Sequence, residues 1–204
     1  MKINTKIRYF AVIHKFFLSK IASIIFLILC LIRLVNQFTY FYKLPYILEI
    51  IANITLISFS FSLNKITKSK PLKISSISMA IGGCLGLISQ LRFISAVWIW
   101  LDEHHVSIMI YIISALYFAA LCFAFYMFHK CFKNKRTITN TALFISILIT
   151  FRFILLFVRV PYDIIYWTVS ILMFTQYLLF SWFFYSINKL NENRQNRCDA
   201  TKQI

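Results

Sequence analysis

The sequence has few charged residues, and especially few acidic ones. Only 14% of its 204 residues are charged, and six Asp and Glu stand against 22 Lys and Arg, which gives a net charge of +16. Soluble domains carry about 25% charged residues, so this shortage argues against a soluble globular protein. Glycine and proline occur three times each. No proline falls in the middle of a long apolar run, which disfavours a transporter built on helices broken at the membrane midplane.

The residues that metal and catalytic chemistry require are also scarce. No two of the five cysteines have the Cys-x-x-Cys spacing of a zinc or redox motif, and we interpret them as small apolar residues. The four histidines lie at or beyond the ends of the apolar runs, which argues against haem and against a histidine base beside a serine nucleophile. Residues 102–105, Asp-Glu-His-His, read as a polar turn, because adjacent histidines cannot easily share one tetrahedral ion. The sequence predicts no metal site, no cofactor and no catalytic residue.

Long apolar runs are what the sequence has in abundance. Its residues are 60% hydrophobic, with 22 Phe, 11 Tyr and a mean hydropathy of +0.76. About 20 mostly apolar residues are needed to cross the hydrocarbon of a membrane, and an isolated span must be helical to satisfy its backbone there. Six segments qualify: 21–42, 44–63, 75–100, 106–128, 141–160 and 164–186. We therefore predict an all-α integral membrane protein, a six-transmembrane-helix bundle with one domain at 21–186.

The basic residues between the runs predict how the chain is oriented. Seventeen Lys and Arg fall in the N-terminal segment, the 64–74 and 129–140 loops and the tail, whereas the opposite loops hold two. By the positive-inside rule both termini are cytoplasmic, and we expect a bacterial inner or plasma membrane. This distribution accounts for the net charge without nucleic acid as a partner, because no nucleic-acid-binding pattern accompanies it.

The two flanking segments are short. Residues 1–20 place apolar residues at helical spacing with lysines between them, which fits either a helix lying on the cytoplasmic membrane face or a frayed basic tail. Residues 187–204 form a polar cytoplasmic tail that is too short for a catalytic domain. A kinase or cyclase fused to a membrane sensor is therefore not expected.

Small residues recur in the third run. Ser78, Gly82 and Gly86 are four residues apart, a spacing that lets two helices approach closely. We predict that this face packs in the core of the bundle or, in the alternative, at a dimer contact.

Three arginines interrupt the odd-numbered runs. Arg33, Arg92 and Arg152 are separated by 59 and 60 residues, and each precedes an aromatic-rich stretch and an outside turn. The pattern suggests three repeated helical hairpins related by an axis along the membrane normal, although evenly spaced loops alone give a similar period. An arginine at mid-bilayer costs roughly 2.5–3.5 kcal/mol. We expect these arginines to face the bundle interior, a watery cavity or acidic partners.

Acidic partners are few at that depth. Glu49 is the one carboxylate well inside a span, at a depth that suits Arg33. Other polar residues lie at a similar depth, and arginine binds phosphate and carboxylate bidentately. The predicted ligand-binding residues are Arg33, Arg92, Arg152, Asn36, Gln37, Glu49, Asn53 and Tyr111.

Two functions are compatible with this sequence. In the first, the protein binds or moves an anionic small solute or lipid headgroup in an outward-facing, arginine-lined pocket. In the second, the arginines only hold helices together and reach headgroups, and the protein is a non-catalytic accessory, sensor or immunity-type subunit that contacts a membrane protein partner or a second copy of itself. Membrane lipids are partners in both cases, and neither function is enzymatic. An enzyme that acts on lipid phosphates is a more distant alternative, because the acid–base residues for it are missing. Arginines that converge favour the first, whereas arginines that point outward favour the second.

Overall fold

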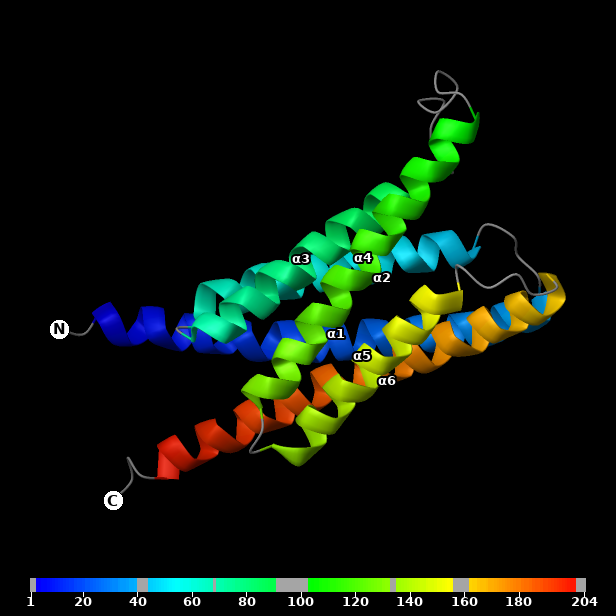
Figure 1. Ribbon diagram of the computed structural model, residues 1–204. Helices are drawn as coiled ribbons and strands as arrows, with labels where there is room; N and C mark the ends of the chain where they lie inside the picture. The colour runs from blue at the N-terminus through cyan, green and yellow to red at the C-terminus, as the bar shows by residue number, and fades with distance from the viewer. Residues whose placement is uncertain are drawn as a thin grey trace.

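The computed structural model describes residues 3–39, 44–67, 69–90, 103–132, 135–155 and 162–200 (Figure 1). These residues form six helices and no strand, so the prediction of an all-α fold with six helices is confirmed for this part of the chain. The helices are α1 Ile3–Thr39, α2 Leu44–Ile66, α3 Lys70–Gln90, α4 Glu103–Cys131, α5 Arg136–Leu155 and α6 Tyr162–Ala200.

Each helix contains a stretch long and apolar enough to cross a membrane, as in a multi-pass membrane protein. These stretches are Leu18–Asn36, Leu44–Lys65, Lys70–Gln90, Tyr111–Cys131, Arg136–Leu155 and Trp167–Leu190. The third and fifth begin about one helical turn before the predicted 75–100 and 141–160. The reason is that the flanking basic residues continue the helix instead of forming a loop. The last part of the predicted third span, 91–100, lies outside the described residues.

The first and last helices are much longer than a membrane requires. Helix α1 has 37 residues and α6 has 39, whereas about 20 suffice to cross the hydrocarbon. The predicted boundaries at residues 20 and 186 therefore fall inside continuous helices. The start of α1 and the end of α6 lie at the same end of the bundle, which we call the terminal end; the opposite end is the distal end (Figure 1).

The helices pack as a closed ring in which each contacts its two neighbours in the chain, and α6 closes the ring by packing against α1. Hydroxyl groups contribute to these contacts. Ser75 and Ser78 of α3 donate to the backbone of α4, and Ser23 of α1 and Ser181 of α6 each donate to the other's carbonyl. Many large apolar side chains are exposed on the outside of the ring, which suits a lipid-facing surface.

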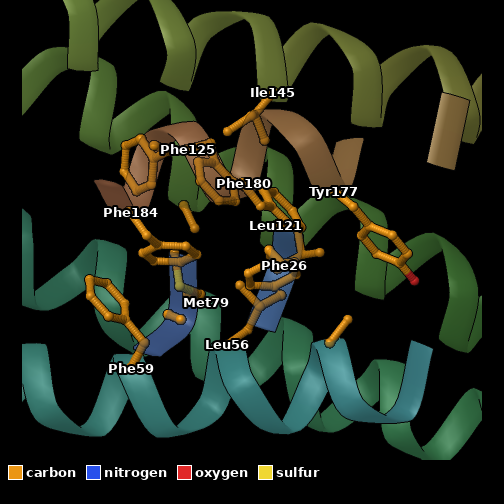
Figure 2. Close-up of a cluster of buried hydrophobic side chains, with 14 of the residues drawn as sticks. Phe26, Leu56, Phe59, Met79, Leu121, Phe125, Ile145, Tyr177, Phe180 and Phe184 are labelled. Carbon is orange, nitrogen blue, oxygen red and sulfur yellow. The ribbon is translucent and has the colours of Figure 1, made fainter. Parts of the chain in front are cut away.

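Aromatic side chains fill the ring towards the terminal end (Figure 2). Phe180 of α6 lies edge-on to Phe26 of α1 at 4.9 Å and stacks on Phe125 of α4 at 5.2 Å between ring centroids. Phe59 of α2 meets Phe184 at 4.5 Å. Met79 of α3 and Ile145 of α5 complete the core, so all six helices contribute to it. These rings fix the lateral positions of the helices in the half of the bundle next to the site described below.

The small residues of α3 allow close contact with both neighbouring helices. A Cβ added at Gly86 would lie 2.6 Å from the Asn53 amide of α2, and one at Gly83 would lie 2.6 Å from Ile57. On the other side, a Cβ at Gly82 would lie 2.7 Å from Leu121 of α4. The structure thus places the predicted small-residue face in the core of the bundle.

Candidate anion-binding site

A layer of polar side chains crosses the bundle on the distal side of the aromatic core. All six helices contribute to it, because each carries a polar residue at that height in an otherwise apolar sequence. We call this set the polar layer: Arg33 of α1, Glu49 and Asn53 of α2, Gln90 of α3, Tyr117 of α4, Arg152 of α5, and Gln176 and Tyr177 of α6.

Arg152 is held on three sides. Its Nη2 lies 3.2 Å from Oε1 of Glu49 and forms an ion pair, while its Nη1 donates to Oε1 of Gln176. The guanidinium carbon also lies 5.3 Å from the centre of the Phe118 ring, within the range of a cation–π contact. The side chain is only 9% exposed. This arginine therefore faces the interior, where a carboxylate, an amide oxygen and an aromatic ring surround its charge.

Glu49 of α2 binds side chains of two other helices, α3 and α5. One carboxylate oxygen receives Arg152, and the other accepts a hydrogen bond from Nε2 of Gln90. The sequence suggested Arg33 as the partner of Glu49 on grounds of depth. That expectation is wrong for the ion pair, which Glu49 forms with Arg152, because depth alone does not specify which helix faces which across the ring.

Arg33 differs from Arg152 in lacking such partners. Its side chain is 5% exposed, and Nε and Nη1 are buried without a hydrogen-bond partner in the described part of the chain. A buried guanidinium group with unsatisfied donors is costly, because the lost hydration is not replaced. Arg33 therefore presents a buried cation with two donor nitrogens that have no acceptor among the described residues.

The other buried polar side-chain atoms without a partner are also in the polar layer. Across the residues whose surroundings the structure describes, they are Oδ1 of Asn53, Oε1 of Gln90 and the Tyr177 hydroxyl. Tyr177 sits at the edge of the aromatic core with its hydroxyl directed away from the phenyl rings (Figure 2). That hydroxyl is within electrostatic range of Arg33, Glu49 and Arg152. Buried polar groups are normally paired, so their gathering at one level marks this layer as unusual.

The predicted site residues are only partly brought together. Arg33, Arg152, Glu49 and Asn53 belong to the polar layer. Asn36 lies one turn from Arg33, is buried and has an interaction partner. Tyr111 is 55% exposed and is not part of the layer. Arg92 and the side chain of Gln37 lie outside the described residues.

Four members of the layer were not predicted: Gln90, Tyr117, Gln176 and Tyr177. The two glutamines carried a usable signal, since each is a strongly polar residue within an apolar stretch, as Arg152 is. The two tyrosines did not, because 11 tyrosines are spread over the chain and a phenol suits a membrane helix in several roles.

A separate hollow of about 330 Å³ lies between α2 and α3 nearer the terminal end. Its lining is largely apolar and includes the exposed side chains of Phe61, Ile77 and Ile81. It opens on the outside of the ring and does not reach the polar layer. The described residues contain no cluster of His, Cys, Asp and Glu able to hold a metal ion.

Comparison of the chain with protein-family models, curated proteins and solved structures finds no match. The case for a function therefore depends on the chemistry of the polar layer.

Proposed function

We propose that this protein binds or moves a small anion, either a solute or the headgroup of an anionic lipid, in the polar layer. The observation that carries the proposal is Arg33, a residue that is only 5% exposed and whose guanidinium atoms Nε and Nη1 lack partners among the described residues. Arginine presents a planar fork of donors that matches carboxylate and phosphate oxygens. An anion at this position supplies the missing acceptors and compensates the charge.

The layer divides into a framework and a binding part. Arg152, Glu49 and Gln176 satisfy one another and hold α2, α5 and α6 together. Arg33 and the Tyr177 hydroxyl have donors to spare. The proposal therefore assigns anion binding to Arg33 first and gives Arg152 a mainly structural role. Arg92, the third arginine of the series, stays a predicted contributor.

The membrane context is part of the same proposal. We place the terminal end in the cytoplasm, on the evidence of the basic loops, in a bacterial inner or plasma membrane. The polar layer then lies in the outer half of the membrane and opens outward. The interpretation as three repeated hairpins accompanies this placement, because it puts one arginine of each hairpin at the same level.

Mass spectrometry of the purified protein tests the proposal directly. Wild type is compared with Arg33→Gln for co-purifying anionic lipids and metabolites. Arg136→Gln is the matched control, because that arginine is exposed at the start of α5. A species present in wild type and the control but lost from Arg33→Gln supports the site. If all three proteins carry the same species in the same amounts, Arg33 binds no ligand and the proposal fails.

The length of α1 and α6 favours a second candidate function. About 15 residues of α1 precede its membrane stretch and ten of α6 follow, which corresponds to about 22 Å and 15 Å of helix. Such extensions give an accessory, sensor or immunity-type subunit a place to contact a protein partner or a second copy. Site-specific crosslinking from these extensions in cells tests this candidate, and an absence of protein adducts at every position argues against it.

A further inference from the structure

The unpartnered atoms of the polar layer are of two kinds. Nε and Nη1 of Arg33 can only donate, whereas Oδ1 of Asn53 and Oε1 of Gln90 can only accept. The Tyr177 hydroxyl can do either. A simple carboxylate or halide satisfies the donors and leaves both amide oxygens without a partner. A ligand that satisfies the whole layer must therefore bring hydrogen-bond donors of its own.

The two amide oxygens are fixed in place by their surroundings. Nε2 of Gln90 donates to the Glu49 carboxylate, and only the NH₂ end of an amide can do so, which sets Oε1 on the other side. The Asn53 amide packs directly on the α3 backbone at Gly86, where a Cβ would lie 2.6 Å from both Nδ2 and Oδ1. Turning the Gln90 amide over would set its oxygen against the Glu49 carboxylate, so the unpartnered atom of Gln90 is an acceptor.

The charge of the layer restricts the ligand further. Its described residues include two guanidinium groups, Arg33 and Arg152, and one carboxylate, Glu49, which leaves an excess of positive charge. An anion compensates that excess, whereas a zwitterion leaves it. The donors that the ligand brings should accordingly be neutral, and hydroxyl groups are the simplest that fit.

Building on the proposed function, we propose that the polar layer selects an anion that carries hydroxyl groups. The anionic group sits on Arg33, and the hydroxyl groups donate to Asn53 Oδ1 and Gln90 Oε1. This chemistry is shared by a glycerol phosphodiester, as in a lipid headgroup, and by a small hydroxycarboxylate, as in a free solute.

Two matched pairs of probes test the selectivity and distinguish the sources. Phosphatidylglycerol and phosphatidylmethanol are both phosphodiester monoanions, and only the first has free hydroxyl groups. Lactate and propionate make the same comparison for a solute. Affinities are measured by native mass spectrometry for the lipids and by ligand-dependent thermal shift for the acids. We expect the hydroxylated member of one pair to bind about tenfold more tightly, because its analogue leaves buried acceptors unpaired. The pair whose two members differ in affinity shows whether the ligand is a lipid headgroup or a free solute.

Variants locate the preference within the layer. Asn53→Leu removes one acceptor at nearly constant volume, and Gln90→Met removes the other together with the Nε2 donor to Glu49. We expect either to bring the affinity ratio of the discriminating pair close to one. Thr55→Val is the control: Thr55 is buried on the same helix as Asn53, and its hydroxyl donates to the carbonyl of Ile51 within α2. It should leave the ratio unchanged.

The outcomes separate this inference from the function on which it depends. Equal binding of both members of each pair, lost in Arg33→Gln, overturns the hydroxyl preference and leaves the anion site standing. No binding of any of the four probes, or binding that Arg33→Gln does not weaken, overturns both. An undiminished preference in both Asn53→Leu and Gln90→Met also overturns the assignment, because the acceptors then lie elsewhere.

Discussion

The Arg152 guanidinium and the Glu49 carboxylate form an ion pair of 3.2 Å between residues 103 positions apart in the chain. Both side chains are largely buried, and Gln90 and Gln176 complete their hydrogen bonds. A buried pair satisfied in this way specifies which helices meet more than it adds stability, since desolvation offsets much of the Coulomb attraction. Its removal is therefore informative mainly when only one partner is changed.

Replacing Glu49 with Gln should destabilise the bundle by roughly 3–5 kcal/mol, because Arg152 is left as a buried cation without its counter-charge. The measurement is thermal unfolding in detergent. Glu192→Gln, at an exposed position of α6, serves as the control and should change little, because the Gln amide oxygen can still accept the hydrogen bond from Asn188 Nδ2. In the double variant Glu49→Gln with Arg152→Gln the loss should be smaller than the sum of the single losses. Additive losses would show that the two residues do not interact.

Gly83→Ala should destabilise by about 1–3 kcal/mol through overpacking between α2 and α3. The new Cβ would lie 2.6 Å from Ile57 and 3.1 Å from the Asn53 carbonyl oxygen, and the backbone atom cannot move aside. Gly82→Ala meets only the Leu121 side chain and the nearby Leu121 nitrogen at 3.4 Å, so a smaller loss is expected. Thermal unfolding of the two variants shows which substitution causes the larger loss of stability. A more stable Gly83→Ala protein would mean that α3 does not approach α2 so closely.

Phe180→Ala should cost about 3 kcal/mol, because it leaves a cavity between the rings of Phe26 and Phe125. Phe144→Ala removes the same phenyl group at a position that is 59% exposed on the outside of the helix ring, and it should destabilise the protein much less. Both proteins are compared by thermal unfolding in the same detergent. Equal losses would contradict the placement of the aromatic core.

Reporter fusions should place both ends of the chain in the cytoplasm. Alkaline phosphatase, which is active only outside the cytoplasm, should be inactive when fused after residue 204 and active when fused after residue 102. The physical reason is the excess of Lys and Arg in the loops at the terminal end. The reverse pattern of activity would invert the orientation and with it the outward-facing site.

The sequence predicts the number and type of the helices well, because each apolar run is long and the basic stretches between the runs are distinct. It predicts less well where the helices end, since Lys70 and Arg136 are compatible with either a loop or a first helical turn. The pairing of Glu49 could not be predicted. Depth along a span follows from counting residues, but the partner depends on how six helices are arranged around the ring.

The ring closed by α6 packing on α1 has a consequence for biosynthesis. Glu49 enters the growing chain 103 residues before Arg152. At about 5–20 residues per second, translation leaves the carboxylate without its counter-ion for roughly 5–20 s. Gln176 is made later still, and only the sixth helix completes the enclosure. The nascent protein therefore passes through stages in which the Glu49 carboxylate has no counter-ion, and we expect a chaperone or insertion machinery to matter most at these stages.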